Sequence, residues 1–471
     1  MIYVVGAAVL IAMGFVLEAR ARDKDVSGAA WLPLFWIVIC ASRSVSQWLS
    51  ILGIGYFNAV DYGHADANGS SIDKIVLTIA IVLGLFIICR RRGALRRLVN
   101  GNEPLFVFVA FLGMTVLWSD IPEASFRRWI RLMGSLVIAG VLIVEPDPIT
   151  SLRVVLRRFA YFAIPLSVLF VKYLPNLGTL YTALGERMWV GIALMKNGLG
   201  HLCLVTSFVL IWEVIIGSRL GKSGMTRPRV FFDLMILAMS LWLLKGPGGS
   251  NSSAALGCLI LGTLMLACSR LPVVKTNFRR IGLFAGIAAT YFWLAQSTFG
   301  VVEGIVTSLG RNMTFTDRTP LWSTLVDLGS TNLLGGFGYG GFWTDERAAY
   351  VATKAGTFRQ AHNGYLEIFI EGGVVAIVLL CVALVSVFRS IQRSSDYESG
   401  VFRLCLFTIV LIANVTESSF ARERDLLTFV FFLIALAEPI GINQTIHAPR
   451  GAALPAGGDT APWRPDVVSK A

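Results

Sequence analysis

The sequence contains few charged residues. Asp, Glu, Lys and Arg make up 15% of its 471 residues, whereas hydrophobic residues make up 55%. A soluble domain carries about 25% charged residues, and its core cannot bury this much apolar surface. The composition therefore excludes an ordinary soluble enzyme and predicts a protein whose mass lies mostly within a membrane.

The seven cysteines include no pair at Cys-x-x-Cys spacing, and all of them lie inside or at the edge of apolar runs. Disulfide frameworks and structural zinc sites are typically marked by short, regular cysteine spacings. We therefore expect neither a disulfide framework nor a metal site, and we expect no cofactor.

Apolar runs of about 15–20 residues recur throughout, and each is nearly or fully long enough to cross the bilayer as a helix. The first run, Met1 to Leu17, has no basic residue before it and no small-residue cleavage pattern after it. We expect it to remain as a membrane helix. The sequence predicts an all-α, polytopic membrane protein with about 12–13 transmembrane helices, at 1–17, 31–50, 72–89, 104–118, 129–145, 159–174, 198–216, 230–245, 253–269, 281–299, 364–388, 401–418 and 426–441.

The net charge of +12 does not indicate a nucleic-acid partner, because the basic residues cluster in alternate short connections between the apolar runs. That pattern follows the positive-inside rule and makes these connections cytoplasmic. We expect a multi-pass protein of the bacterial inner membrane. Arg127-Arg128 and the Arg422 and Arg424 pair are exceptions, because they fall on the outer side. The basic clusters are at 20–24, 90–97, 153–158, 219–229, 270–280 and 389–393.

The longest connection, about 300–363, faces outward in this scheme, and connections of that length are usually functional or disordered. The last residues, 442–471, are rich in Pro, Gly and Ala and lack an apolar run. We expect them to form a disordered cytoplasmic tail after a single transmembrane domain at 1–441. No internal repeat is evident, which weakens a transporter interpretation.

The outward connection contains residues suited to chemistry. His362 can exchange a proton near neutral pH, and Arg318 and Arg359 lie in the same connection. A guanidinium at a membrane surface is a bidentate ligand for phosphate. Two structural alternatives stay open, in which His362 caps the following helix and Arg318 anchors a lipid headgroup.

A glycine run in the same connection formally matches G-x-G-x-x-G at Gly336, Gly338 and Gly341. No βαβ unit surrounds it, so a dinucleotide site is not expected. The favoured interpretation is a turn whose backbone packs closely. The alternative is a backbone N–H cradle for phosphate.

Further cations lie near other outward ends of the predicted helices. Arg187 and Lys196, which precedes Asn197, follow one span, and Lys245 ends another. Together they predict a cationic vestibule that suits a diphosphate.

These motifs resemble the bacterial O-antigen ligase and O-antigen polymerase superfamily, including exopolysaccharide polymerases of the ExoQ type. The resemblance is strongest over about 187–380. It rests on Arg187-x-x-x-Gly191 with Lys196-Asn197, the serines within 250–253, Arg318 with Trp322, the run Gly335–Gly341, and His362-Asn363-Gly364-Tyr365-Leu366-Glu367 leading into Glu371-Gly372-Gly373. Weaker matches are Leu117-Trp118-Ser119 and Thr416-Glu417-Ser418.

The resemblance implies an enzyme that transfers a glycan from an undecaprenyl-diphosphate carrier to an acceptor hydroxyl at the periplasmic face, without an essential metal. It implies that Arg318 and His362 are catalytic, and that Arg187, Lys196, Asn197, Lys245 and Arg359 bind substrate. The acceptor is another glycan or lipid A-core. Membrane lipids and other polysaccharide-assembly proteins are further expected partners. Relatives often have a basic residue where this chain has Asn251.

We favour polymerisation in exopolysaccharide or O-antigen assembly, because the segment from Arg187 to Asn197 looks most like exopolysaccharide members. An O-antigen ligase acting on lipid A-core is the first alternative. A transporter or flippase for lipid-linked or anionic solutes is the second, although it predicts more charges within the spans than Arg43, Arg131 and Glu213. A metal-dependent glycosyltransferase is the third, with acidic motifs at Asp23 and Asp25 or at Asp61 and Asp66.

Overall fold

The computed structural model describes residues 2–20, 26–54, 70–91, 93–181, 185–217, 226–247, 252–281, 318–394 and 396–437. The predicted tail at 442–471, the part of the outward connection at 300–317, Asn251 and the four aspartates of the acidic motifs lie outside these ranges.

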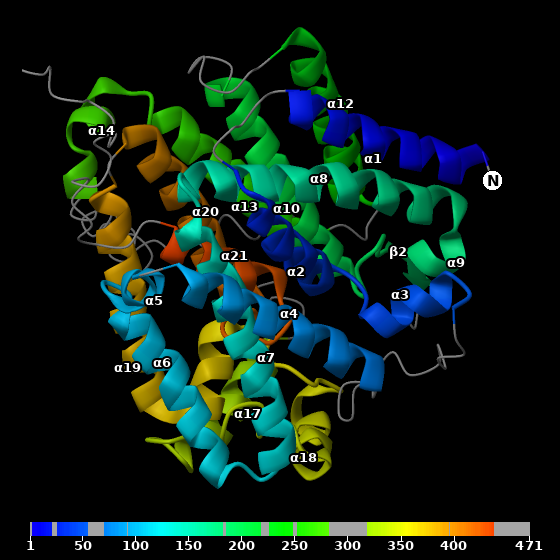
Figure 1. Cartoon of the computed structure of the whole chain (residues 1–471). Coiled ribbons are helices and arrows are strands. Elements are labelled where there is room, and N and C mark those ends of the chain that lie inside the picture. Colours follow the sequence, from blue (N-terminus) through cyan, green and yellow to red (C-terminus); the bar gives the residue numbers. More distant parts are fainter. Residues whose placement is uncertain are drawn as a thin grey trace, which may run out of the picture. The chain divides into compact units, whose positions relative to one another are not determined.

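The described chain is almost entirely helical (Figure 1). Strands β1 (Thr179–Tyr181) and β2 (Arg187–Trp189) pair antiparallel, with Thr179 opposite Trp189 and Tyr181 opposite Arg187. The longer helices are α1 (Ile2–Arg20), α2 (Trp31–Ala41), α3 (Val45–Ile51), α4 (Ser71–Arg90), α5 (Ala94–Val99), α6 (Glu103–Met114), α7 (Pro122–Gly140), α8 (Pro148–Tyr173), α10 (Lys196–Trp212), α12 (Arg227–Lys245), α13 (Ser253–Cys268), α17 (Arg318–Ser330), α18 (Asp345–Ala355), α19 (Gly364–Gln392), α20 (Tyr397–Thr416) and α21 (Leu426–Leu436). Short helical turns are α9 (Pro175–Gly178), α14 (Pro272–Thr276), η1 (Gly28–Ala30), η2 (Thr115–Trp118), η3 (Val141–Val144), η4 (Glu213–Gly217) and η5 (Phe278–Arg280).

The protein is an all-α, multi-pass membrane protein, as predicted. Within the described ranges, six helices are long and apolar enough to cross a membrane, and the pair Gly28–Ala41 and Val45–Ile51, bent by 78°, makes a seventh candidate. Apolar helices at Glu103–Trp118, Ser253–Cys268 and Leu426–Leu436 are shorter. The six are α1, α4, α8, α10 extended to Ile216, α19 and α20.

Fewer helices meet this test than the predicted 12–13 spans. The runs at 104–118, 253–269 and 426–441 belong to the three shorter helices. Those at 129–145 and 230–245 belong to α7 and α12, which carry charged residues along their length, such as Arg131 and Asp233. The run at 281–299 lies almost wholly outside the described residues.

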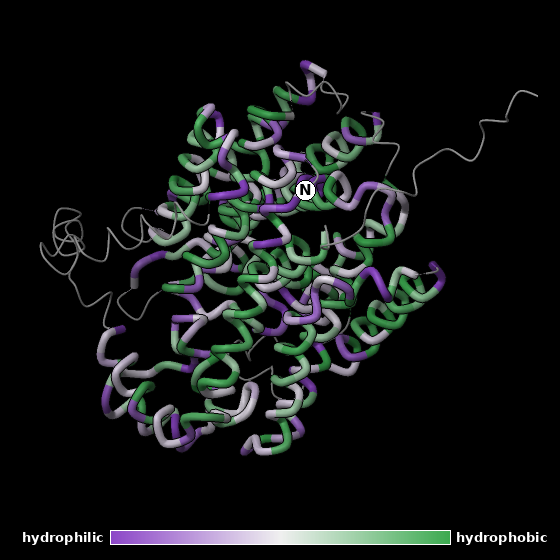
Figure 2. Tube along the Cα trace, turned by 90° about the vertical axis from the view of Figure 1, so that its left-hand side faces the viewer, coloured by the Kyte–Doolittle hydropathy of each residue, from purple (hydrophilic) through white to green (hydrophobic). Residues whose placement is uncertain are grey.

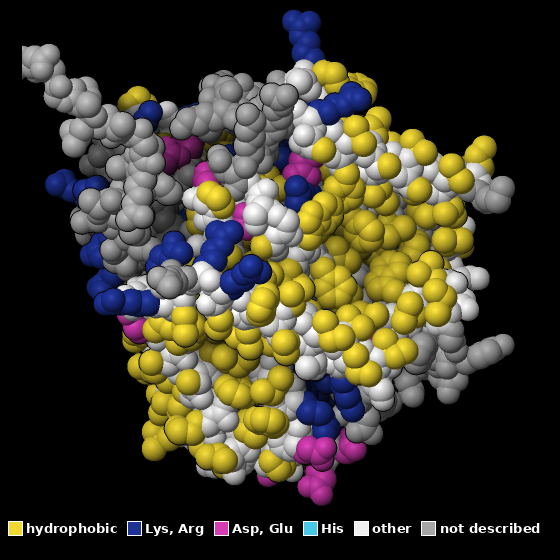
Figure 3. Space-filling model, in the orientation of Figure 1, with side chains coloured by type: hydrophobic (Ala, Val, Ile, Leu, Met, Phe, Trp, Pro, Cys, Tyr) yellow, Lys and Arg dark blue, Asp and Glu magenta, His cyan; other side chains and the backbone are white. Residues whose placement is uncertain are grey.

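Burial separates central helices from peripheral ones. The apolar windows of α8 and α10 are 78% and 83% buried, whereas those of α1 and α4 are 17% and 28% buried. The exposed side chains of α1 and α4 are hydrophobic, for example Val9 and Ile79. Hydrocarbon tails are the medium in which such a surface is stable. Figure 2 shows hydrophobic residues along most helices, and Figure 3 shows a broad hydrophobic surface on one face.

Helix α8 differs from its prediction. It begins at Pro148, because Asp147 accepts hydrogen bonds from the N–H groups of Ile149 and Thr150 and caps its first turn. The predicted basic connection at 153–158 is therefore part of a helix and does not face solvent freely.

The arginines of that segment form ion pairs inside the protein. The Glu213 carboxylate lies 3.0 Å from Arg153, 3.4 Å from Arg157 and 3.6 Å from Arg229. Glu18 of α1 lies 2.8 Å from Arg158 and 3.7 Å from Arg157. We call these six residues the buried ionic group. Its charges are mostly paired with one another, which suits a role in joining α1, α8, α10 and α12.

The described part of the outward connection is folded. Helices α17 and α18 and the start of α19 share a small hydrophobic cluster made by Leu321, Leu325, Phe342, Val351, Ala361 and Ile370. Figure 1 shows these helices together at one end of the molecule.

The glycine run packs its backbone against α19. The N–H groups of Phe337 and Gly338 donate to the carbonyls of Ile370 and Glu371, at 2.9 and 2.8 Å, and the Tyr339 N–H donates to Thr115. These amides already have acceptors within the protein, so the structure supports the close-packing interpretation over the phosphate cradle. Gly373 of α19 has φ of 65°, and a side chain there would collide with the Leu334 carbonyl.

Candidate active site

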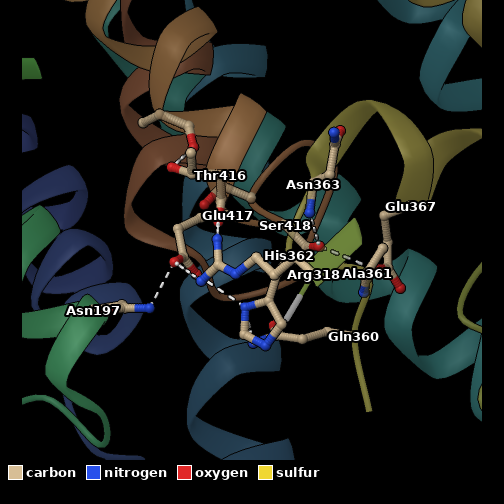
Figure 4. A network of polar contacts seen from close by, with 12 residues as sticks. Asn197, Arg318, Gln360, Ala361, His362, Asn363, Glu367, Thr416, Glu417 and Ser418 are labelled. Carbon is tan, nitrogen blue, oxygen red and sulfur yellow. Dashed lines mark hydrogen bonds and ion pairs between the residues drawn. The ribbon is translucent and has the colours of Figure 1, made fainter. Parts of the chain in front are cut away.

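Three residues singled out in the sequence meet at one carboxylate, that of Glu417 (Figure 4). Its Oε1 accepts hydrogen bonds from Asn197 Nδ2 at 2.6 Å and from Arg318 Nη2 at 3.1 Å. Its Oε2 lies 3.5 Å from His362 Nδ1. We call these four residues the Glu417 group. They come from α10, α17, the connection before α19 and the end of α20.

The local sequence places Glu417 where α20 ends. Its backbone is extended, with φ of −140° and ψ of 148°, so the chain turns away from the helix axis there. Asn414 Oδ1 accepts from the N–H groups of Ser419 and Phe420, at 3.0 and 2.7 Å, and so fixes the turn. Gly364 is required beside it, because a side chain at that position would collide with the Asn414 amide.

Arg318 begins α17 and reaches across to the end of α20. One guanidinium nitrogen donates to the Thr416 carbonyl and another to Glu417. The last carbonyls of a helix lack partners within the helix and carry partial negative charge. This position therefore holds the guanidinium plane in one orientation, while its side chain stays 18% exposed.

His362 has φ of 49°, a left-handed conformation that is uncommon for residues other than glycine. The ring lies edge-on to Phe358, and Gln360 Nε2 is 3.3 Å from each ring nitrogen. Strained backbone of this kind persists only where the surroundings fix it, and it is enriched at functional sites.

The residue that caps α19 is Asn363, not His362. Asn363 Oδ1 accepts from the N–H groups of Tyr365 and Leu366, at 3.0 and 3.1 Å, and its own N–H donates to Ser418 Oγ at 3.1 Å. The capping role considered for His362 is therefore wrong, because the neighbouring side chain performs it. The imidazole is left to interact with Glu417 and Gln360.

A second carboxylate, Glu367, holds the connection that carries His362. Its oxygens accept from Trp343 Nε1 at 2.7 Å, the Ala361 N–H at 2.6 Å and Ser418 Oγ at 3.0 Å. Trp322 Nε1 donates to the Ala361 carbonyl at 2.8 Å. Both backbone groups of the residue before His362 are thus fixed by side chains, which orients the imidazole.

The electrostatics favour an ionised Glu417. Burial alone raises the pKa of this carboxyl, but the hydrogen bond from His362 and the nearby side chains of His201 and Arg318 outweigh that effect and lower the pKa below its ordinary value. A carboxylate next to Nδ1 favours the tautomer in which Nδ1 carries the proton and Nε2 can accept one.

Glu417 is the site residue that the sequence analysis missed. It appeared there only within the weak match Thr416-Glu417-Ser418. An acidic residue just after an apolar run usually marks the end of a membrane span. The available signal was its place in an ordered set of motifs, since its contacts lie 99 and 220 residues away along the chain.

The other predicted site residues lie outside the Glu417 group. Lys196 borders a hollow, next to Asn197. Arg187 is exposed on β2 and donates to the Val171 carbonyl at 3.3 Å. Lys245 is exposed at the end of α12. Arg359 is 53% exposed and pairs with Asp345 at 2.9 Å. The hollow is lined by Trp189, Lys196, Leu199, Gly200, Leu243, Leu244, Gly246 and Ser252.

The described residues contain no group of three His, Cys, Asp or Glu side chains placed to hold a metal ion. The cations near the Glu417 group are arginine, lysine and histidine side chains. The arrangement can orient an anionic group and accept a proton.

Comparison with known proteins gives two matches. Residues 234–381 match the O-antigen ligase family. This range contains Lys245, Arg318, Arg359 and His362 but ends before Glu417. The exopolysaccharide production protein ExoQ of Rhizobium meliloti (strain 1021) is 26% identical over 376 residues, which covers 76% of this chain and 81% of that protein.

Proposed function

Because the chain belongs to the O-antigen ligase and polymerase superfamily, we propose that it transfers glycans from an undecaprenyl-diphosphate carrier to an acceptor hydroxyl and thereby polymerises them. The coarser function, a glycan-processing membrane enzyme of ligase or polymerase type, follows from the family. The proposal also includes the undecaprenyl-diphosphate carrier, the direction of the reaction, and a location at the periplasmic face of the bacterial inner membrane.

The observation that carries the proposal is the Glu417 group. In the proposed step, the acceptor hydroxyl oxygen attacks the anomeric carbon, and the bond from that carbon to the carrier diphosphate breaks. The electron pair leaves with the diphosphate, and the hydroxyl proton passes to His362 Nε2. Glu417 orients the imidazole and stabilises the imidazolium that forms.

Positive charge at the leaving group is the main electrostatic requirement of this reaction. Arg318 is held by the end of α20 close to His362, with a guanidinium edge that suits a phosphate oxygen. We propose that arginine and lysine side chains neutralise the diphosphate and that the reaction is independent of metal ions.

We assign the donor diphosphate to the protein surface beside Lys196. The N-termini of α10 and α13 meet there, at Lys196 and Ser252. Helix N-termini attract anions through their unpaired N–H groups and their dipoles. Arg187 and Lys245 lie one or two residues from Trp189 and Gly246, which line the same hollow. Asn197 connects this region to Glu417.

The orientation in the membrane is also proposed. Asn197 and Glu213 lie at opposite ends of α10 and its extension, about 24 Å apart at 1.5 Å per residue. The Glu417 group and the buried ionic group are therefore near opposite faces of the bilayer. The alternation of basic connections supports a periplasmic location for the Glu417 group and for residues 318–363.

The polymerase preference is supported by the similarity of the chain to ExoQ, an exopolysaccharide production protein. Deletion of the gene tests it. The expected result is single repeat units on their carrier and loss of high-mass polymer. Accumulation of full-length, carrier-linked polymer beside bare lipid A-core would instead identify a ligase. Repeat units retained on the cytoplasmic leaflet would identify a flippase.

Substitution of Arg318 tests the transferase chemistry. Arg318→Lys keeps the charge but cannot donate two parallel hydrogen bonds, so we expect it to remove most transfer activity in membranes. Arg270→Lys, an arginine that pairs with Glu398 outside the Glu417 group, is the matched control for the same exchange. Wild-type output from Arg318→Lys at equal protein level would remove this arginine from the mechanism.

A further inference from the structure

A different carboxylate near the Glu417 group, that of Glu423, contacts two arginines and has two more beside it in the chain. Arg128 Nε and Arg131 Nη1 of α7 lie 3.5 and 3.6 Å from Glu423 Oε1. Arg422 and Arg424 precede and follow Glu423 in the chain. We call these four arginines with Glu423 the Glu423 cluster. They include three of the four arginines that break the positive-inside pattern, namely Arg128, Arg422 and Arg424.

The Glu423 cluster adjoins the proposed base. Arg422 donates to Gln360 Oε1, and Gln360 Nε2 is 3.3 Å from each ring nitrogen of His362. One side chain therefore separates the cluster from the imidazole. An anionic group held by these arginines would belong to the part of a substrate nearest the reacting hydroxyl.

The connection that carries Arg422, Glu423 and Arg424 is strained and firmly held. Ala421 and Arg424 have φ of 54° and 56°, although neither is glycine. The Tyr339 hydroxyl donates to the Ala421 carbonyl, and Asp425 accepts from the N–H groups of Leu427 and Thr428, at 2.8 and 3.0 Å. Such strain is maintained mainly where a segment must present its side chains in one arrangement.

Some donors of the cluster have acceptors within the protein, because Arg128 donates to the Gly340 carbonyl and Arg422 donates to Gln360, but at least one donor does not. Glu423 is the carboxylate that contacts Arg128 and Arg131, and its side chain is 17% exposed. Of the other acids close by, Asp425 caps α21, and Glu371 lies within α19. The buried Nε of Arg424 has no hydrogen-bond acceptor among the described residues. An unsatisfied buried donor is costly, and an added oxyanion would supply an acceptor.

We propose that the Glu423 cluster binds an oxyanion carried by the acceptor sugar, so that the glycan handled by this protein is acidic. This inference rests on the proposed function. The donor diphosphate is assigned to the Lys196 side of the Glu417 group, so the cluster is available to the acceptor. Arginine forks bind carboxylates and phosphates through paired, charge-assisted hydrogen bonds.

The inference is tested with the polymer that disappears when the gene is deleted. We expect its repeat unit to contain an acidic group. Repeat-unit fragments of that polymer should bind the full-length protein in phosphatidylcholine nanodiscs, and fragments whose carboxyl groups have been reduced or whose phosphates have been removed should bind at least about tenfold more weakly. A neutral polymer, or equal binding of the two fragments, would overturn the inference.

Variants of the cluster should change this binding in opposite directions. Arg131→Gln and Arg424→Gln should weaken binding of the acidic fragment about tenfold or more, without changing binding of the neutralised fragment. Glu423→Gln removes the carboxylate that competes with the ligand for these arginines, and it should tighten binding of the acidic fragment. Arg127→Gln, one residue from Arg128 and paired with Glu123, is the control and should bind as the wild type does. An unchanged or weakened affinity in Glu423→Gln would contradict the inference.

Two further outcomes are distinguishable. If the arginine variants change only how fragment binding depends on added phosphatidylglycerol, the cluster binds lipid headgroups and the inference fails. If deletion of the gene removes no polymer, the proposed function fails before the fragments are made. Binding is measured without turnover, so an inactive enzyme does not obscure the result.

Discussion

Two carboxylates with different surroundings lie at the two ends of α10. Glu213 is fully buried among arginines that are at most 14% exposed. Glu417, which binds Asn197 at the other end, has neighbours 18% and 19% exposed, one of them a histidine. The first arrangement suits a structural role, in which ion pairs hold neighbouring helices together. The second is open and includes a group that can exchange a proton. We therefore expect similar residue types to serve stability at one end and chemistry at the other.

Loss of the imidazole should have the largest effect. His362→Ala removes the proposed base, and we expect transfer to fall about 10²–10⁴-fold while the protein still inserts and unfolds at the same temperature. Polymer formation in membranes containing equal amounts of protein measures this. A wild-type rate would mean that the Glu417 group has only a structural role, as the buried ionic group has.

Disruption of the buried ionic group should have the next largest effect, on stability. Glu213→Gln leaves buried arginines without their shared carboxylate, at a cost of about 3–5 kcal/mol. We expect less protein in the membrane and a lower unfolding temperature. The activity of each remaining folded molecule should be close to that of the wild type. Wild-type stability together with loss of activity would contradict this assignment, because the buried ionic group would then serve the reaction and not the stability of the protein.

Substitution of Glu417 should affect both properties less severely. Glu417→Gln keeps the shape but loses the charge that orients His362, and we expect about a tenfold to hundredfold loss of transfer, within the range for a general-base arrangement. Steady-state rates of the purified protein in nanodiscs measure the loss. A rate equal to that of the wild type would remove Glu417 from the chemistry.

The same variant predicts a pH dependence of stability. Glu417 has a pKa in the folded protein below its ordinary value of 4.5. Its ionised form therefore stabilises the fold above that value, and this contribution is lost as the pH falls through the lowered pKa. The difference in unfolding temperature between wild type and Glu417→Gln should narrow on acidification below pH 4.5. A constant difference would contradict the lowered pKa.

Arg359 should have the smallest effect. It was predicted to bind substrate, but it pairs with Asp345 at an exposed position, where ion pairs contribute little. We expect Arg359→Gln to change transfer less than about twofold, measured alongside His362→Ala. A large loss of transfer would mean that the site extends beyond the Glu417 group and includes Arg359.

Much of the fold could be predicted from the sequence, because apolar runs report helices directly. The prediction was less accurate where a helix buries charge. Arg153 and Arg157 looked like a cytoplasmic connection, since their partner Glu213 lies on another helix. The positions of Arg318, His362 and Asn197 stood out through motif order. Their meeting point at Glu417 could not be found from any local pattern, because it depends on how α10, α17 and α20 pack.

The break in α19 at Gly373 affects how the protein responds to the bilayer. Membrane helices tilt when the hydrocarbon layer becomes thicker or thinner. In α19 the backbone is not helical at Gly373, and the N–H groups of Val374 and Val375 donate to the carbonyls of Leu333 and Leu334, so the segment before the glycine run is anchored to α19 at this break. The start of α19 packs closely on Asn414 at Gly364, and the Asn363 N–H before it donates to Ser418. We expect these contacts to hold the spacing between His362 and Glu417, so that it changes little with membrane thickness.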